Sequence, residues 1–423
     1  MSTSPTNPAH DHLLQTTCAI VGGGPAGMVL GLLLARAGIE VTVLEKHADF
    51  LRDFRGDTVH PTTLTLLDDL GLFDRFDRLP QSHISQVKVP AEDGAEVVVG
   101  DLTRLPVRHP YIAMVPQWDL LNLISEAASH EPRFTLLTEH EVTGTVREGE
   151  RVIGVDFTDP QGNGRLLADL TVACDGRWSA VRASVDLPTK ELPVDFDVWW
   201  YRITTERNIG EALLPRTHNG HAVIAIPRRG YVQVAQLGRK GTDSSIRGRG
   251  IEVFRAETAD LLSDVTGDVS SIESMDDVKH LDVRVDRLRR WHAPGVLCIG
   301  DAAHAMSPVG GVGINLAVQD AVAAARLLAG PLRQGKLLRV HGDRILARVR
   351  RRRLVATVLT QNVQRLMHAK IVMPVLNGME IRVPKFLKVL LRRFPSVTAL
   401  PAYIVGIGVR PEKVPTWARR EGC

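Results

Sequence analysis

Cysteine is scarce in this sequence, and its few copies form no recognisable pairing pattern. The chain has 423 residues, and its four cysteines show neither a CxxC pair nor a metal-ligand spacing. They are Cys18, Cys174, Cys298 and Cys423. The first three stand in apolar, strand-like runs, where a buried structural thiol is expected rather than a redox group. This usage predicts no metal site and favours a reducing, cytoplasmic compartment.

Long apolar runs and a secretion signal are also missing. The longest apolar stretch, at 397–409, is too short to span a bilayer and is interrupted by Pro401. The first residues are polar and proline-rich, without a basic segment before an apolar one, so we expect a disordered leader at 1–14 rather than a signal peptide. With 44% apolar and 24% charged residues the composition is that of a globular protein of more than one domain.

Negative charge is scarce in the last part of the chain. Residues 331–423 contain 20 Lys and Arg against 4 Asp and Glu, although the whole chain has a formal net charge of only +4. Within this part, residues 385–394 (KFLKVLLRRF) have the pattern of an amphipathic helix. Peripheral contact with an anionic membrane is one interpretation. A solvated helical cap on the preceding domain is the favoured one, and no motif supports nucleic-acid binding.

The segment after the leader has the pattern of a nucleotide-binding βαβ unit. A short β-branched run ends in glycines at 22–24, a helix is expected at 25–37, and the next strand is expected at 39–44. Such a compact unit implies a parallel sheet with a right-handed crossover. The sequence therefore predicts a strand–turn–helix–strand arrangement at the start of the domain.

The turn of this unit matches the pattern GxGxxG. Its glycines permit a tight turn, close approach of a pyrophosphate and close packing of the helix on the strand, and the start of the helix attracts phosphate. Glu45, after the second strand, can accept hydrogen bonds from two ribose hydroxyls and would repel a 2′-phosphate. The pattern predicts FAD or NAD rather than NADP at this turn. The residues of the turn are Gly22, Gly24, Pro25, Ala26 and Gly27.

Two more segments present an aspartate directly after an apolar strand. Asp301 follows the run 296–300, and Asp175 begins the turn in CDGRWSAVR. Carboxyl ends of parallel strands are where open α/β sheets bind ligands. A glycine-rich stretch after Asp301 opens an Ala-rich helix at 315–329, whose positive end would stabilise negative charge on the N1–C2=O edge of a reduced flavin. For Asp175 a simple helix N-cap remains the alternative.

These motifs together resemble the three fingerprints of single-component FAD-dependent monooxygenases, the aromatic hydroxylases of the p-hydroxybenzoate hydroxylase type. The matching segments are GGGPAGM with Glu45, CDGRWSAVR and IGDAAHAMSPVGGVGINLAVQDA, in the family's order, and the resemblance covers residues 15–365. It implies FAD as the bound cofactor and NADH or NADPH as the co-substrate. The cofactor-binding residues that it implies are Gly22, Gly24, Pro25, Ala26, Gly27, Glu45, Arg55, Gln117, Asp175, Gly176, Asp301, Gly311, Val312, Gly313, Ile314 and Asn315.

The resemblance also implies a role for each group of these residues. Arg55 would contact the flavin half of FAD, and Gln117 its ribityl or phosphate region. The turn at Asp175 is the motif linked to both FAD and NAD(P)H, and Asp301 would contact the ribityl-phosphate part. Residues 311–315 would border the isoalloxazine. Many family members carry Gln where this chain has Val312, so contacts of the backbone are expected there.

The chemistry that the resemblance implies is carried by the flavin. NAD(P)H would reduce FAD, O₂ would add at C4a, and the resulting hydroperoxide would hydroxylate an aromatic or polyketide-like small molecule. No catalytic side chain is therefore assigned, and His304 is expected to be structural. The alternative is an FAD-dependent reductase acting on a prenyl or quinone-like lipid at a membrane surface. A halogenase is disfavoured because the sequence has no WxWxIP segment.

The expected fold class is α/β, with a Rossmann-like FAD-binding domain, an inserted antiparallel-sheet substrate domain and a helical C-terminal tail. The FAD-binding domain is assigned to 15–189 and 288–330, and the basic helical region to 331–423. Several short β-rich runs suggest the substrate-binding sheet at 190–287. In this sheet the run Trp199, Trp200 and Tyr201 is expected to wall a substrate cavity, together with His221. Because side chains alternate along a strand, at least one of the three aromatic residues is expected to pack elsewhere. The oligomeric state is left open.

Overall fold

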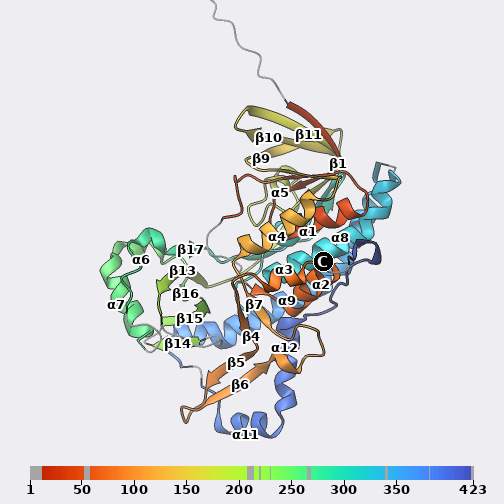
Figure 1. Ribbon diagram of the computed structural model, residues 1–423. Helices are drawn as coiled ribbons and strands as arrows, with labels where there is room; N and C mark the ends of the chain where they lie inside the picture. The colour runs from red at the N-terminus through yellow and green to blue at the C-terminus, as the bar shows by residue number, and fades with distance from the viewer. Residues whose placement is uncertain are drawn as a thin grey trace, which may run out of the picture.

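Five parallel strands form the centre of the largest sheet, in the order β20–β11–β1–β2–β8. The computed structural model describes residues 12–51, 58–206, 214–218, 221–228, 230–263, 268–338, 342–380 and 382–420. Antiparallel strands β19, β10 and β9 extend this sheet (Figure 1). The strands are β1 His12–Val21, β2 Val41–Leu44, β8 Phe134–Leu137, β9 Glu141–Glu148, β10 Arg151–Asp159, β11 Gly162–Ala173, β19 His292–Ala293 and β20 Val296–Cys298.

A layer of helices covers the parallel strands. Helix α1 packs against both α4 and α8, and is apolar on nearly all sides because it lies between them (Figure 1). Helix α9 packs along the other side of α8. The helices of this layer are α1 Pro25–Arg36, α2 Pro61–Asp69, α3 Phe73–Asp77, α4 Gln117–Ser129, α8 Gly313–Arg333 and α9 Asp343–Met367, and the short α5, Ala180–Ser184, packs instead against β9.

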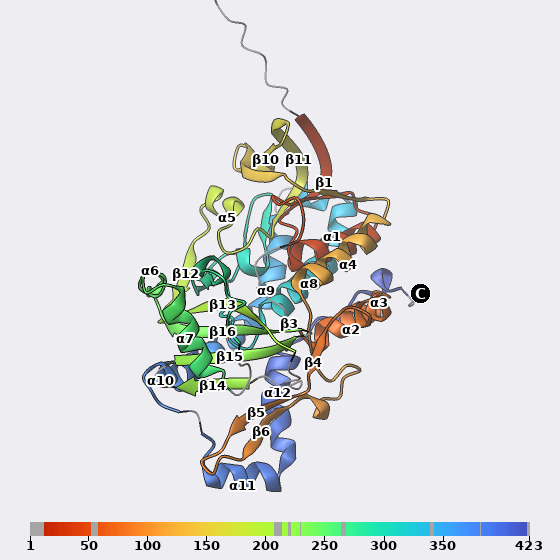
Figure 2. The same ribbon diagram turned by 60° about the vertical axis from the view of Figure 1, so that its left-hand side comes forward.

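A five-stranded antiparallel sheet stands beside this layer, in the order β14–β15–β16–β13–β17. Helices α6 and α7 cover its outer face, as Figure 2 shows, and side chains of α7 share a core cluster with that face. The elements are β13 Phe196–Thr204, β14 Leu214–His218, β15 His221–Arg228, β16 Tyr231–Arg239, β17 Lys279–Leu281, α6 Asp243–Gly248 and α7 Ile251–Leu261.

Three small sheets and the C-terminal helices complete the described chain. Strands β3, β7 and β4 pair in one sheet, β5 with β6 in a second, and β12 with β18 in a third. After α9 a π-helical turn, His368–Val372, leads into α10, and α11 packs against the β5–β6 hairpin. The elements are β3 Thr58–Val59, β4 Ser82–Ile84, β5 Gln86–Pro90, β6 Glu96–Asp101, β7 Ile112–Met114, β12 Thr189–Leu192, β18 Val285–Leu288, α10 Met373–Leu376, α11 Lys385–Arg393 and α12 Ala399–Gly406.

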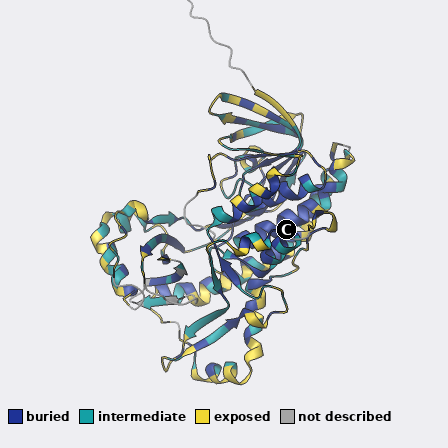
Figure 3. Ribbon diagram, viewed as in Figure 1, coloured by how far each residue is buried: buried dark blue, intermediate teal, exposed yellow. Residues whose placement is uncertain are grey.

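The last described segment returns to the first helix. Arg36, in α1, donates from Nη1 to the carbonyl oxygen of Ala418 at 2.9 Å. Val414 and Ala418 are buried in the same core cluster as α1 and the parallel strands. Figure 3 shows the helices on the sheet buried on one side and partly exposed on the other. The core of the nucleotide fold is therefore closed by residues from both ends of the sequence.

The predicted fold class is confirmed, and three local expectations need correction. Strand β1 begins at His12, so the predicted leader at 1–14 is too long, because the ladder with Gly164–Ala168 of β11 orders a segment that is polar in composition. The second strand begins at Val41 rather than at residue 39. The helix expected to open directly after Asp175 is only the short α5, which begins at Ala180. In the described part of the chain no helix has the length and apolar character needed to cross a bilayer.

Candidate functional site

The glycine-rich turn after β1 is packed too closely for any side chain at two of its positions. Gly22 has φ +101°, and a Cβ there would lie 2.6 Å from the carbonyl oxygen of Cys174 and 2.9 Å from the Cα of Asp175. A Cβ on Gly27 would lie 2.0 Å from the carbonyl oxygen of Gly22. These glycines bring the start of α1 against the strand ends, and the turn at Asp175 against the first turn.

Gly24 differs, because a Cβ there would meet nothing within 4 Å. It is the N-cap of α1, and neither a side-chain cap nor an acidic residue occupies the first turn of that helix. The first N–H groups of α1 therefore face open space with a positive dipole end behind them. This is the geometry that a pyrophosphate requires.

Glu45 lies beside this turn at the end of β2. Its side chain is 2% exposed, and its Oε2 accepts a hydrogen bond from the Gly23 N–H at 2.8 Å while Oε1 accepts one from the His47 N–H at 3.1 Å. The carboxylate is thus held in a fixed orientation against the glycine-rich turn, where an adenosine ribose would lie.

Asp301 lies where three elements converge. Gly300, at the end of the β20 strand segment, has φ +58°, and a Cβ there would lie 3.3 Å from Ala26 of α1 and 3.4 Å from Ala317 of α8. Burial raises the pKa of Asp301, although its side chain keeps 36% of its surface exposed. The Asp301 carboxyl group is therefore largely surrounded by protein but keeps a part of its surface that a ligand can reach.

The N-terminus of α8 is as open as that of α1. Its N-cap is Val312, with no side-chain cap and no acidic residue in the first turn, and a Cβ on Gly313 would meet nothing within 4 Å. Gly311 has φ +63°, and a Cβ there would collide with Thr58. The chain therefore presents two uncapped helix starts, packed beside one another, on the same edge of the sheet.

A clamp from the segment 58–63 fixes the loop before α8. Thr58 donates from Oγ1 to the Gly311 carbonyl at 2.7 Å, and His60 Nε2 lies 3.0 Å from the same oxygen. Burial lowers the pKa of His60 to about 4, so its imidazole is neutral at pH 7. Thr62 and Thr63 both donate to Oδ1 of Asn315, at 2.6 and 2.9 Å.

Sequence analysis assigned no role to these threonines or to His60. The signal that could have found them is the run of hydroxyl side chains around His-Pro, at the spacing of a strand end and a helix start.

A buried ion-pair triad supports the Asp301 loop from behind. Asp320 of α8 accepts from His304 Nε2 at 2.5 Å, from Arg353 Nε at 2.8 Å and from the Gly300 N–H at 3.1 Å. All three side chains are at most 1% exposed. Burial alone would raise the pKa of Asp320, but His304 and Arg353 bring it below its ordinary value. His304 is structural, as expected.

A stripe of polar residues on α9 holds the segment 286–309 in the same way. Gln361 donates to the carbonyls of Asp286 and Ala305, at 2.7 and 3.3 Å. Gln364 donates to the carbonyls of Ser307 and Val309, at 2.8 and 2.9 Å, and its Oε1 accepts from the Ser307 N–H. We define the α9 polar stripe as Arg353, Thr357, Gln361 and Gln364 of α9 together with His368 of the π-helical turn that follows, all buried. It ties the basic C-terminal region to the loop before α8.

The turn at Asp175 meets the glycine-rich turn. The alternative that Asp175 is the N-cap of the next helix is wrong. Ser179 is the N-cap of α5 and accepts from the Arg182 N–H at 2.9 Å, while Asp175 Oδ2 accepts from the Val181 N–H at 3.3 Å. Burial raises the pKa of Asp175, and its Oδ1 is buried without a hydrogen-bond partner in the described chain. Such an orphaned atom is available to a ligand.

For two of the predicted cofactor residues, Gln117 and Arg55, the cofactor role stays a prediction. Gln117 is the first residue of α4, the helix that packs against α1. Arg55 lies outside the described residues. The remaining predicted residues come together at the carboxyl edge of the parallel strands, around the starts of α1 and α8.

The prediction that Trp199 and Tyr201 wall a substrate cavity is wrong. Both are 0% exposed and pack with Phe254 of α7, on the outer face of the antiparallel sheet. Trp199 donates from Nε1 to Asp243 Oδ1 at 2.8 Å. Alternation along β13 places Trp200 on the opposite face, which the aromatic run alone did not reveal. His221 lies in β15, and its side chain is outside the described part of the structure.

The inner face of this sheet reaches the loop before α8. Trp200 of β13 and Ile224 of β15 stand in one cross-strand row through Ala235, and both pack in the same cluster as Val309. Trp200 is half-buried, and its Nε1 has no partner among the described residues. The even-numbered face of β13 is therefore the one that faces the candidate flavin loop.

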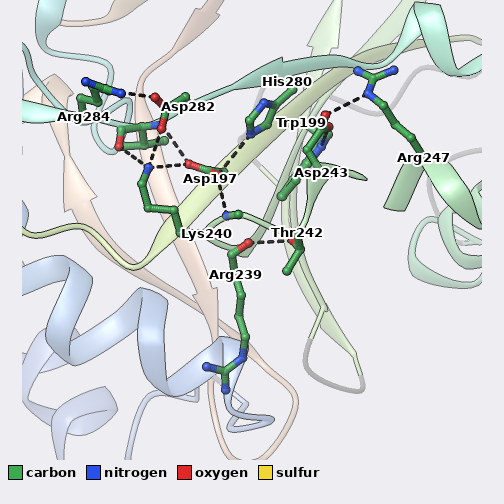
Figure 4. A network of polar contacts seen from close by, with 12 residues as sticks. Asp197, Trp199, Arg239, Lys240, Thr242, Asp243, Arg247, His280, Asp282 and Arg284 are labelled. Atoms are coloured by element: carbon green, nitrogen blue, oxygen red, sulfur yellow. Dashed lines mark hydrogen bonds and ion pairs between the residues drawn. The ribbon is translucent and has the colours of Figure 1, made fainter. Parts of the chain in front are cut away.

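A polar network at one end of the antiparallel sheet centres on Asp197, Lys240 and Asp282 (Figure 4). Asp197, 1% exposed, accepts from Lys240 Nζ at 2.9 Å and from the Val283 N–H at 3.0 Å, and Lys240 also contacts Asp282 at 2.6 Å. Burial would raise the pKa of Asp197, but these donors lower it overall. Arg177 donates to the Asp282 carbonyl at 3.1 Å and lies 3.9 Å from Asp301. Sequence reasoning missed this arginine, which stands next to the predicted Asp175–Gly176 turn.

Two features test whether this site suits FAD. Gly24 and Gly313 leave open space at two uncapped helix starts, and the orphaned Asp175 Oδ1 and half-open Asp301 lie at the same sheet edge. A dinucleotide offers a pyrophosphate for the first helix start and an electron-accepting ring for the second. The residues present fit the cofactor.

Comparison with known proteins agrees with this geometry. The family described as "FAD binding domain" matches residues 15–362. The 6-methylpretetramide 4-monooxygenase of Streptomyces rimosus is 35% identical over 348 residues, which is 79% of this chain and 80% of that protein. A 12-dehydrotetracycline 5-monooxygenase/anhydrotetracycline 6-monooxygenase of the same species is 30% identical over 72% of this chain and 60% of its own length.

Solved structures show the same fold. OxyS anhydrotetracycline hydroxylase from Streptomyces rimosus superposes with a TM-score of 0.70 at 22% identity, over 94% of this chain and 77% of its own. The structure of pqsL, a probable FAD-dependent monooxygenase from Pseudomonas aeruginosa, gives 0.69 at 20% identity, over 84% of this chain and 96% of its own.

Proposed function

The chain belongs to the FAD-binding-domain family of flavin-dependent monooxygenases, and on that premise we propose that its substrate is a polycyclic aromatic polyketide. The predicted oxidoreductase activity, with FAD as cofactor and NAD(P)H as co-substrate, is confirmed at the level of the family. The alternative of a reductase acting on a prenyl or quinone-like lipid does not fit the relatives, which are named as monooxygenases.

FAD supplies the activation of O₂ and the transfer of one oxygen atom, and the chain supplies the positions. We assign the pyrophosphate to the free N–H groups of α1 and the adenosine ribose to Glu45. Asp301, through the exposed part of its carboxylate, would accept hydrogen bonds from the ribityl hydroxyls. The start of α8, fixed by Thr58 and Asn315, would stabilise negative charge on the ring edge with backbone N–H groups that need no rearrangement.

The observation that supports the substrate class is the position of Trp200. This indole and Ile224 stand in one cross-strand row and share a cluster with Val309, so we assign them as an apolar wall next to the loop assigned to the flavin ring. A wall of this kind favours a planar, extended aromatic substrate that can stack on the indole. The buried, unpartnered Nε1 offers one hydrogen bond to a carbonyl or phenol oxygen of that substrate.

The test compares a tetracyclic aromatic polyketide with a simple phenol as substrate for the FAD-loaded protein. We expect the polyketide to stimulate NAD(P)H oxidation and O₂ uptake and to gain one oxygen atom by mass spectrometry. Trp200→Ala should raise KM for the polyketide about ten-fold or more, since a lost aromatic contact in a pocket has that magnitude. Trp417→Phe, at the far C-terminal edge, is the matched control and should leave KM unchanged.

Two results would count against the proposal. Efficient turnover of simple phenols without turnover of any polycyclic compound would show that the substrate class is wrong. Failure of the loaded enzyme to consume O₂ with any aromatic substrate and either nicotinamide would contradict hydroxylation itself.

A further inference from the structure

Helix α11 exposes an apolar surface that no part of the described chain covers. Phe386 is 75% exposed, Val389 65%, Leu390 42% and Phe394 52%. On the opposite side of the helix, Leu387 and Leu391 pack against the β5–β6 hairpin. The helix is therefore anchored by one apolar side and presents a second one to solvent. We call Phe386, Val389, Leu390 and Phe394 the α11 outer face.

Basic residues flank this face, and acidic ones are missing from its segment. No Asp or Glu occurs between Val383 and Pro411. Lys385, Arg392 and Arg393 are exposed and form no ion pair with any described residue. The fourth cation of the helix, Lys388, turns inward and is neutralised by Asp93. The free positive charge thus lies on the side of the helix that carries the exposed apolar residues.

The acidic groups close to α11 belong to the hairpin and the preceding loop, and most are already paired. Glu96 lies 3.5 Å from Lys88, and Glu380 lies 2.6 Å from Arg382. Glu92, at the hairpin tip, contacts the segment before α11 through its backbone N–H. Among the described residues no carboxylate pairs with Lys385, Arg392 or Arg393 beside the outer face, so its basic character is not cancelled locally.

The position of α11 leaves this face accessible. Figures 1 and 2 both show the helix at one extremity of the molecule, beyond the β5–β6 hairpin, and Figure 3 shows it as mostly exposed. A flat surface can therefore approach α11 without contacting the nucleotide fold. The next helix, α12, extends back from this region. Its Val405, and Ile407 directly after the helix, line a small cavity of about 20 Å³ together with Val312 of the candidate flavin loop.

We propose that the α11 outer face docks on the surface of an anionic phospholipid bilayer. Exposed Phe and Leu flanked by Lys and Arg are the pattern of a helix that lies in the membrane interface, with apolar side chains below the headgroups and cations among the phosphates. A second copy of this chain fits poorly, because a two-fold interface would place Arg392 and Arg393 against the same basic patch. The charge complementarity selects the anionic lipid surface.

Flotation of the FAD-loaded, full-length protein with lipid vesicles tests the proposal. Vesicles of equal parts phosphatidylcholine and phosphatidylglycerol should carry the protein upward, vesicles of phosphatidylcholine alone should not, and rising salt should release it. Arg392→Gln/Arg393→Gln should weaken binding about thirty-fold, since each cation near an anionic surface contributes roughly a factor of five. Phe386→Ser/Leu390→Ser should abolish flotation.

Matched variants on α9 test whether vesicle binding is specific to the α11 outer face or is a non-specific property of exposed basic and apolar residues. Arg348→Gln/Arg351→Gln removes the same charge, and Leu366→Ser removes an exposed leucine, so both should float like the unmodified protein. FAD content and melting temperature, measured for every variant, should be unchanged because all the substituted side chains are exposed.

Three results would overturn the proposal. These are the absence of flotation with anionic vesicles, equal flotation of the α11 and unmodified proteins, and equal binding to neutral vesicles. A dimer in solution that the α11 substitutions dissociate, without vesicle binding, would instead assign the face to a second copy of the chain.

Discussion

Helices α9 and α11 belong to the same basic C-terminal region, yet α9 buries polar side chains whereas α11 exposes apolar ones. The α9 polar stripe lies against the segment 286–309, whose backbone groups need hydrogen-bond partners. The α11 outer face lies at an end of the molecule where nothing from the described chain packs on it. The comparison teaches that periodicity identifies the faces of a helix, while the partner decides which face is buried.

The largest effect should follow from removing the cation of the α9 polar stripe. Arg353→Leu leaves Asp320 buried with one charged partner lost, so we expect the free energy of unfolding to fall by about 3–5 kcal/mol. Urea denaturation of the FAD-free protein measures this. Arg351→Leu, an exposed position on the same helix, should change stability by about 0.5 kcal/mol or less. An equal loss of unfolding free energy in Arg353→Leu and Arg351→Leu would contradict the claim that the buried face of α9 is stabilised by the ion pair.

A smaller loss should follow from removing a neutral member of the stripe. Gln364→Leu abandons the Ser307 and Val309 carbonyls and the Ser307 N–H, which should cost about 1–3 kcal/mol. Because these groups belong to the loop before α8, FAD affinity should fall as well, as titration of flavin fluorescence would reveal. Asn362→Leu, on the exposed side of α9, is the control. Unchanged FAD affinity in Gln364→Leu would show that the α9 polar stripe does not support the candidate FAD site.

The histidine at the end of the stripe should make stability depend on pH. Burial lowers the pKa of His368 to about 4 from an ordinary value of 6.5, so the unfolded chain binds the proton first as pH falls. The stabilising contribution is complete above pH 6.5 and is lost on going down towards pH 4, by about 1–2 kcal/mol after allowance for solvent screening. His368→Asn should flatten this part of the stability profile, and His130→Asn, at an exposed helix end, should not. A profile of unchanged steepness in His368→Asn would refute the assignment.

The smallest effect should come from α11. Phe386→Ser removes an exposed ring, so the free energy of unfolding should change by about 0.5 kcal/mol or less, whereas a comparable change in a core costs several. Thermal unfolding measures it, with Leu391→Ser on the inward side as the contrasting variant. A large loss in Phe386→Ser would mean that the outer face is packed against something.

Much of the fold was predictable because its signals are local. The βαβ unit is marked by a β-branched strand, glycines with required close approaches and a helix that is apolar all round. Glycines at 22 and 27 announce tight packing by their lack of a side chain. The start of β1 was not predictable, because residues 12–14 are ordered by a ladder to β11, more than a hundred residues away.

The candidate site was predictable where a motif carries it and not where support comes from a distance. Asp301 and the start of α8 follow from their own sequence, but the clamp by Thr58 and His60 joins positions about 250 residues apart. The prediction of the substrate-facing residues Trp199 and Tyr201 was wrong for a different reason. Three consecutive aromatic residues cannot share one side of a strand, and only the packing of α7 decides that Trp200 faces the loop.

The hydrogen bond from Arg36 to the carbonyl oxygen of Ala418 has a consequence for the order in which the chain can fold during synthesis. A chain emerges from the ribosome from its N-terminus, so α1 and the first strands exist long before their last packing partners. Val414 and Ala418, buried against that first helix, are among the last described residues to be synthesised. The nucleotide-binding fold can therefore start to form early in synthesis, but its packing is complete only after residues 414–418 have been added. Until then the part of α1 that these residues contact lacks its final partners.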